Sequence, residues 1–274
     1  MKKIGFIDYY LSEWHANNYV GWLKEEADKN GYGFEVTHAW AELEVSPVDG
    51  VTTDEWCQKF GVQRCASIEE LCEASDVIII LSPDDPEKHL GYAEAALPYR
   101  KRTYIDKTFA PDYETAVKIF NIAEKHGTPF FSTSALRYAG ELVGMDGSTH
   151  VTTTGGGKYF EQYIIHQAEM VIKIIKSDPM SIIARKHGNS TFADVTFKNG
   201  KTASILQDSS FPFTVCMSGE NGKQTFAPVT SQFFKGLIAD MVNFFETGEI
   251  SFDTNETKQV IKLVEMCIKA RDEL

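Results

Sequence analysis

The sequence predicts an α/β protein in which an N-terminal Rossmann-like, doubly wound parallel sheet precedes an α+β domain with a largely antiparallel sheet. Between residues 76 and 132, short apolar runs alternate with amphipathic helical segments. This alternation is typical of parallel strands joined by helical crossovers. After residue 132 the pattern changes to a long helix and then to closely spaced strands joined by a tight turn, which indicates a second architecture.

Three strands are expected in the stretch from 76 to 132. Val77 to Leu81 is an unbroken apolar run, as in a strand buried on both faces, and Thr103 to Asp106 and Phe130-Phe131 follow it. Ligands of such sheets bind beyond the carboxyl ends of the strands. Ser82-Pro83 and Asp106-Lys107-Thr108 are therefore the first candidate site segments.

Two helices connect these strands. Asp84 and Asp85 supply N-cap chemistry for a helix that Pro86 opens, and the second helix closes at His126-Gly127. Helical spacing predicts that the buried stripes of the two helices contain Leu90, Ala93, Leu97, Ala116, Val117, Phe120 and Ala123.

The segment before residue 76 shows the same alternation of expected strands and helices. The expected elements, in order, are a strand from Ile4 to Ile7, a helix from Trp14 to Lys29, a strand from Phe34 to Thr37, a loop from Glu44 to Thr53, a helix from Asp54 to Phe60, and a helix opened by the capping box Ser67-Ile68-Glu69-Glu70.

The loop after the first strand lacks the glycines of a dinucleotide-binding protein. Such a loop carries Gly-x-Gly-x-x-Gly, because the pyrophosphate approaches the backbone too closely for side chains. Here the loop is Asp8-Tyr9-Tyr10-Leu11-Ser12-Glu13, which places two carboxylates where phosphate would bind. This loop argues against ordinary nucleotide binding. After the second strand, Glu42 is a candidate for holding an adenosine ribose, with a solvated loop residue as the alternative.

The second half is expected to form the α+β domain, with the boundary between residues 134 and 135. Asn199-Gly200 is a strong hairpin signal between its last two strands. The expected elements are a helix from Lys158 to Lys176 after Gly155-Gly156-Gly157, strands from Ser181 to Lys186, Phe192 to Phe197 and Thr202 to Gln207, and helices from Ser231 to Glu246 and Asn255 to Arg271.

The composition and net charge indicate which kinds of binding partner are unfavourable. The 274-residue chain is 43% hydrophobic and carries a net charge of −12, so nucleic acid and anionic membranes are expected to be repelled. No apolar run has the length of a membrane span, and no signal peptide is apparent. Five cysteines without CxxC spacing fit a reducing cytoplasm and no metal site, and the terminal Arg271-Asp272-Glu273-Leu274 is interpreted as a solvated helix end.

Several short segments resemble the Gfo/Idh/MocA family of oxidoreductases. Its members carry a strand ending in Thr-Pro or Ser-Pro, a helix with an early His, and a strand ending in Glu-Lys-Pro. The counterparts here are Ser82-Pro83, His89 and Asp106-Lys107-Thr108. His15, after the altered first loop, is interpreted as structural support for that loop.

The resemblance continues into the second half. Ser134-Ala135-Leu136-Arg137-Tyr138 is similar to the family's interdomain Arg-aromatic segment. The family's glycine run and Asp-x-x-x-His-x-x-Asp helix correspond to Gly155-Gly156-Gly157 and to Gln162, His166 and Glu169, which share one helix face. The motifs differ from the family pattern at the first loop, at Thr108 and at Gln162.

The resemblance implies hydride transfer between NAD or NADP and a sugar, polyol or related hydroxy compound. Lys and His suit this chemistry, because a cation stabilises the developing alkoxide and imidazole accepts the hydroxyl proton. The catalytic candidates are Lys107 and His166, expected to meet in a cleft between the domains. The cofactor-contact candidates are Ile7, Ser82, Pro83 and Asp106. The substrate-binding candidates are Tyr138, Gln162 and Glu169, the last of which is also a candidate for fixing the His166 tautomer.

Two alternatives remain open at this point. One is a homologue that has lost redox function and binds a ligand as a sensor or accessory subunit, because Tyr9 and Tyr10 would fill the cofactor site. The other is a hydrolase or lyase that retains and recycles its cofactor. Family likeness also predicts a homodimer or homotetramer formed through the C-terminal sheet.

Overall fold

The computed structural model describes residues 1–219 and 222–274, and the chain divides into two compact units. The first contains Met1–Ala110, Glu114–Ser132 and Ile238–Ser251, and the second contains Pro111–Tyr113, Thr133–Leu237 and Phe252–Leu274. The predicted domain boundary at residue 134 stays a prediction.

The first unit is built on a six-stranded sheet in the order β3-β2-β1-β4-β5-β6, with every neighbouring pair parallel. This is the strand order of a doubly wound dinucleotide-binding fold, and it confirms the predicted fold class. The strands are β1 (Lys2–Asp8), β2 (Phe34–Ala41), β3 (Gln63–Arg64), β4 (Val77–Ile80), β5 (Thr103–Ile105) and β6 (Phe130–Phe131).

Helices connect these strands. They are α1 (Trp14–Asn30), α2 (Thr53–Phe60), α3 (Ile68–Ala74), α4 (His89–Ala96) with short 3-10 turns at Pro86–Lys88 and Leu97–Tyr99, and α5 (Tyr113–His126). The central strands β1 and β4 form the core of the unit, where Ile4, Phe6 and Ile79 are fully buried. Burial on both faces explains why these strands appear in the sequence as apolar runs.

Two details differ from the sequence prediction. β2 extends to Ala41, beyond the expected end at Thr37, and the two-residue strand β3 was not predicted. The side chain of Asp85, at the N-cap of the Pro86–Lys88 turn, makes no capping hydrogen bond, so the predicted cap is not formed there. A two-residue strand has no period to detect, which is why β3 escaped the pattern analysis.

The second unit contains a six-stranded sheet in the order β12-β11-β7-β10-β9-β8. Its pairs are antiparallel except for β7 and β10, so the predicted largely antiparallel character is confirmed. The strands are β7 (Ser148–Gly155), β8 (Pro179–His187), β9 (Ser190–Phe197), β10 (Thr202–Gln207), β11 (Thr214–Gly219) and β12 (Gln224–Pro228); β7, β11 and β12 were not predicted.

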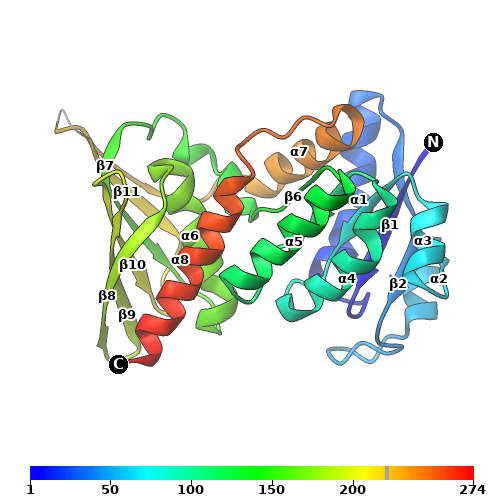
Figure 1. Cartoon of the computed structure of the whole chain (residues 1–274), viewed down its shortest axis with the longest axis horizontal. Coiled ribbons are helices and arrows are strands. Elements are labelled where there is room, and N and C mark those ends of the chain that lie inside the picture. The colour runs from blue at the N-terminus through cyan, green and yellow to red at the C-terminus, as the bar shows by residue number, and fades with distance from the viewer. Residues whose placement is uncertain (220–221) are drawn as a thin grey trace. The chain divides into compact units, whose positions relative to one another are not determined.

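Helices α6 (Phe160–Ile175) and α8 (Asn255–Asp272) pack together and against this sheet on one of its faces (Figure 1). Short 3-10 turns at Ala135–Tyr138 and Gly140–Leu142 precede β7. Helix α7 (Phe233–Thr247) contributes residues to both units. Among the described residues, no helix combines the length and apolar character needed to cross a membrane.

Candidate functional site

The carboxyl ends of β1 and β4 lie side by side, because these two strands pair in parallel from Ile4 to Ile7. They are the point at which the strand order reverses, where ligands of this fold bind. Asp8 ends β1, and Ser82 follows β4 with a positive φ of 78° and only 1% exposure. Ile7 is fully buried in β1, so it lies next to this edge as part of the core.

Asp8 is a buried carboxylate at this edge. One of its oxygens accepts a hydrogen bond of 2.7 Å from the backbone N–H of Tyr9, whereas Oδ2 has no hydrogen-bond partner among the described residues. Burial and repulsion by the Glu13 carboxylate raise the pKa of Asp8 well above its usual range. The chain therefore holds an under-satisfied acid at the start of its first loop.

Glu13 caps the N-terminus of α1. Its carboxylate accepts hydrogen bonds from the backbone N–H groups of His15, at 2.6 Å, and Ala16. Burial raises the pKa of Glu13 to about 7, against the opposing effects of His15 and of the two N–H donors. An acidic side chain of the protein thus occupies the donors that helix N-termini offer to anions.

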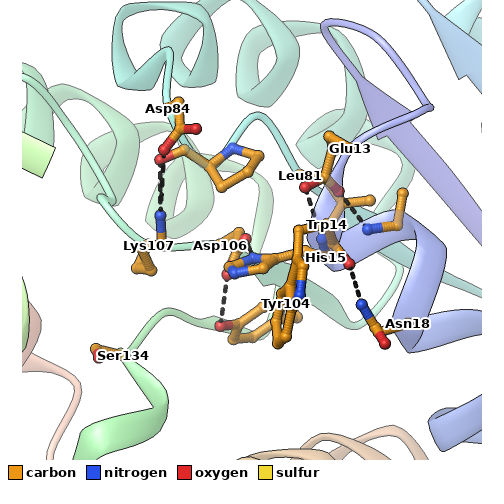
Figure 2. A network of polar contacts seen from close by, with 12 residues as sticks. Glu13, Trp14, His15, Asn18, Leu81, Asp84, Tyr104, Asp106, Lys107 and Ser134 are labelled. Atoms are coloured by element: carbon orange, nitrogen blue, oxygen red, sulfur yellow. Dashed lines mark hydrogen bonds and ion pairs between the residues drawn. The ribbon is translucent and has the colours of Figure 1, made fainter. Parts of the chain in front are cut away.

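His15 and Asp106 form a buried ion pair that ties the start of α1 to the end of β5, as Figure 2 shows. The hydroxyl of Tyr104 donates a hydrogen bond of 3.1 Å to the other oxygen of Asp106. Burial raises the pKa of Asp106, but attraction to His15 and Lys107 outweighs it, and the net pKa lies below the usual range. Both oxygens of Asp106 therefore have protein partners, and its predicted cofactor contact stays a prediction.

Lys107 follows β5, and its side chain turns toward Asp84 (Figure 2). Its ammonium donates a hydrogen bond of 3.1 Å to the Pro83 carbonyl and lies 3.6 Å from a carboxylate oxygen of Asp84. The Lys107–Thr108 peptide bond is cis. The structure thus brings together Lys107 and Pro83, two predicted site residues that are distant in sequence. Asp84, expected as a helix cap, is a partner of Lys107 instead.

His89 has a structural role in this unit. It is fully buried, and its Nδ1 and Nε2 face the backbone carbonyls of Phe109 and Leu81 at 3.0 Å and 2.5 Å. These contacts connect α4 to the segments that follow β4 and β5.

The residues present fit a dinucleotide poorly at its pyrophosphate. That group needs backbone N–H donors and a loop without side chains, whereas Glu13 already binds the donors and Asp8 adds a second carboxylate. Glu42, the ribose candidate after β2, is likewise engaged: it accepts hydrogen bonds of 2.6 Å from Lys88 and 2.8 Å from the Tyr92 hydroxyl. Two positions that contact a dinucleotide in this fold therefore have partners within the chain.

The second unit carries the other catalytic candidate, His166, on α6. The Ser134 hydroxyl lies 2.7 Å from His166 Nδ1. Ser134 Oγ also accepts a hydrogen bond from the Leu136 N–H at 3.3 Å. Ser134 lies 32 residues away in sequence, and no spacing rule pointed to it. Ser134 thus contacts one ring nitrogen of His166, and the role predicted for Glu169 in fixing the His166 tautomer stays a prediction.

Glu169 belongs to a buried charge cluster of the second unit. Its carboxylate pairs with Arg137, at 2.5 Å from Nε, and accepts a hydrogen bond from the Ser134 N–H at 3.1 Å. Arg137 also pairs with Glu256 at 2.6 Å. Glu169 is only 2% exposed, and its carboxylate oxygens have partners within the protein. Its predicted contact with substrate stays a prediction.

Tyr138 and Gln162, the remaining substrate candidates, are half-buried. A Cβ atom built on Gly236 would lie 2.5 Å from Tyr138, so the tyrosine packs closely against α7. Lys107 and His166 belong to different units, and each is placed only within its own. No group of His, Cys, Asp and Glu among the described residues has the arrangement of a metal site.

Comparison with known proteins finds a family model that matches part of the chain. A model described as an oxidoreductase family with an NAD-binding Rossmann fold, the Gfo/Idh/MocA family, matches residues 35–134. The match begins after β1, the first loop and α1, the segment that lacks the glycines. A search of curated proteins finds no match.

Solved structures share the fold over nearly the whole chain. Myo-inositol dehydrogenase from Lactobacillus casei, in complex with NAD(H) and myo-inositol, has a TM-score of 0.80 at 12% identity, covering 99% of this chain and 95% of that one. Scyllo-inositol dehydrogenase from the same organism has 0.78 at 14%, covering 99% and 96%. UDP-N-acetylglucosamine 3-dehydrogenase from Acidithiobacillus ferrooxidans has 0.73 at 12%, covering 98% and 97%. The predicted resemblance is therefore confirmed: the chain resembles the Gfo/Idh/MocA family in sequence over residues 35–134, and it shares the fold of the inositol dehydrogenases over almost its entire length.

Proposed function

We propose that the protein is an NAD(P)-dependent oxidoreductase that moves hydride between nicotinamide and a carbinol carbon of a sugar, polyol or related hydroxy compound. The observation that carries this proposal is Lys107, which lies inside the matched segment at the carboxyl end of β5, with its ammonium held against the Pro83 carbonyl. The solved structures of similar fold include dehydrogenases whose names specify inositols and a nucleotide sugar.

Two side chains of the chain perform the proton and charge steps of this proposal. The Lys107 ammonium donates a hydrogen bond to the reacting oxygen and stabilises its developing negative charge. His166 accepts the hydroxyl proton, and when its Nδ1 donates to Ser134 the lone pair is on Nε2. Nicotinamide, when bound, supplies the hydride acceptor. The cofactor contacts of Ser82 and Pro83 and the substrate contacts of Tyr138 and Gln162 are parts of the same proposal.

The test is turnover of myo-inositol, scyllo-inositol and a panel of aldoses with NAD⁺ and NADP⁺ by the wild type and by Lys107→Ala. Loss of the charge that stabilises the alkoxide is expected to lower kcat/KM by about 10²–10³-fold. Lys125→Ala, which changes an exposed lysine of α5, is the matched control and should retain activity. Unchanged turnover in Lys107→Ala would contradict the proposal.

A second candidate is a homologue that binds a polyol or sugar without redox chemistry. The specific observation in its favour is the first loop, where Glu13 occupies the N-terminus of α1. Protein purified without added nucleotide should be denatured and searched for released NAD(H) and NADP(H) by mass spectrometry. Released nucleotide, or turnover with any substrate of the panel, favours the oxidoreductase. Polyol binding without either result favours the second candidate.

A further inference from the structure

We propose that two acidic side chains of this protein block its pyrophosphate site, by which we mean the end of β1 at Asp8 and the N–H groups of His15 and Ala16 at the start of α1. The Glu13 carboxylate occupies these N–H donors, and Asp8 adds a second carboxylate. A dinucleotide that binds there has to displace or neutralise them. The proposal concerns nucleotide affinity, and it applies to either candidate function.

The first argument concerns hydrogen-bond donors. A helix N-terminus binds phosphate through backbone N–H groups that have no partner within the helix. In this chain the N–H groups of His15 and Ala16 both bond to the Glu13 carboxylate. A phosphate oxygen would have to replace an internal carboxylate that is held by two hydrogen bonds and is 9% exposed.

The second argument concerns charge. Asp8 and Glu13 interact electrostatically with each other and with Asp106, so three acidic groups share this part of the unit. The nearby imidazole of His15 is bound to Asp106. The Oδ2 atom of Asp8 is buried and lacks a hydrogen-bond partner among the described residues. Where Glu13 is ionised, it repels a dianionic pyrophosphate; where Asp8 and Glu13 are protonated, as their raised pKa values favour, the nucleotide still has to displace Glu13 from the N–H groups of α1.

The third argument concerns the spacing of the substituted positions. Counted from the end of β1, the glycines of Gly-x-Gly-x-x-Gly fall at positions 8, 10 and 13, which are Asp8, Tyr10 and Glu13. None of these residues has a positive φ, so this backbone does not require glycine. The side chains at these positions can therefore be removed without imposing a new backbone conformation.

A binding experiment tests the proposal. ADP, which carries a pyrophosphate without nicotinamide, and NAD⁺ are titrated calorimetrically into the wild type, Glu13→Ser and the triple variant Asp8→Gly/Tyr10→Gly/Glu13→Gly. Serine at position 13 removes the charge and retains an N-cap residue. The control is Glu55→Gln, which removes an exposed carboxylate at the start of α2 in the same unit. Thermal unfolding verifies that each variant is folded.

We expect Glu13→Ser to bind ADP and NAD⁺ at least tenfold more tightly than the wild type, the triple variant to bind them more tightly again, and Glu55→Gln to behave as the wild type. The proposal is overturned if the wild type and folded Glu13→Ser bind ADP and NAD⁺ with equal affinity. It is also overturned if neither of the two proteins binds these nucleotides. If the triple variant does not fold, Glu13→Ser alone decides. Because the readout is nucleotide binding, this result is independent of the turnover test on Lys107.

Discussion

Each of the two units contains a strand-to-helix loop in which the Gfo/Idh/MocA family pattern has glycines. The two loops differ in how many of these glycines they contain. The loop from β1 to α1 has none, whereas the loop from β7 to α6 retains Gly155-Gly156-Gly157. A Cβ atom on Gly156 would lie 2.4 Å from the Phe211 carbonyl oxygen. One on Gly157, where φ is 130°, would lie 2.0 Å from the Tyr163 ring. The second loop needs glycine because protein atoms surround it.

The first loop has no such constraint. Its backbone has negative φ at Asp8, Tyr10 and Glu13, and the helix after it is capped by a side chain. Glycine in such a loop serves the ligand rather than the fold. The comparison teaches that packing requires the glycines of the second loop, whereas the backbone of the first loop does not require glycine.

The largest effect is expected where the first loop is anchored. His15→Ala would leave the Asp106 carboxylate buried without its imidazole partner, which should lower the free energy of unfolding by about 3–5 kcal/mol. Chemical denaturation of this variant and of His187→Ala, an exposed histidine in β8, measures the difference. Equal, small losses in both variants would show that the His15 pair does not anchor the loop.

The second loop should be intolerant of a single methyl group. Gly156→Ala forces a Cβ against backbone oxygen and should lower the free energy of unfolding by about 1–3 kcal/mol. Gly21→Ala is the control, because no atom lies within 4 Å of the added methyl group in the middle of α1. That variant should gain about 0.5–1 kcal/mol. A neutral Gly156→Ala would contradict the packing explanation.

The acidic first loop should make stability depend on pH. Glu13 binds its proton more tightly in the folded state, so the free energy of unfolding falls as pH rises from 4.5 to about 7. Asp8, whose pKa is also raised, adds to this fall, whereas Asp106, with a lowered pKa, acts only at lower pH. Glu13→Gln should reduce the slope by at most about 1.4 kcal/mol per pH unit.

Denaturation curves across this interval measure the slope. Glu55→Gln is the control, since the pKa of Glu55 is lowered by hydrogen bonds from Thr52 and its titration falls below the interval. A slope that is identical in the wild type and in Glu13→Gln would mean that Glu13 does not titrate there.

The smallest expected effect measures the contribution of the N-cap hydrogen bond at position 13 to stability. Glu13→Ser and Glu13→Ala remove the same charge, but only serine can accept a hydrogen bond from the first turn of α1. The serine variant should therefore be more stable by about 1 kcal/mol. Thermal unfolding of the pair at one pH measures this difference, and equal stabilities would argue against a capping role.

Much of the first unit follows from the sequence. Apolar runs and helical stripes predicted β4, β5, β6 and α1 within a few residues of their ends, and the C-terminal end of α5, because strands buried on both faces and amphipathic helices leave periodic patterns. In the second unit, β7, β11 and β12 were missed. The threonine-rich β7 lacks an apolar run, and β12 is only half-buried, so neither shows the expected pattern.

The sequence by itself determined the parallel sheet, the family resemblance, the missing glycines and the presence of carboxylates at Asp8 and Glu13. Only the tertiary structure decided what those carboxylates do. It shows that Glu13 binds the N–H groups of α1, that Asp106 pairs with His15, and that Ser134 contacts His166. Periodicity reports which face of an element is buried, because burial repeats along the chain. A hydrogen bond between residues 32 or 91 positions apart has no period, so it appears only when the chain is folded.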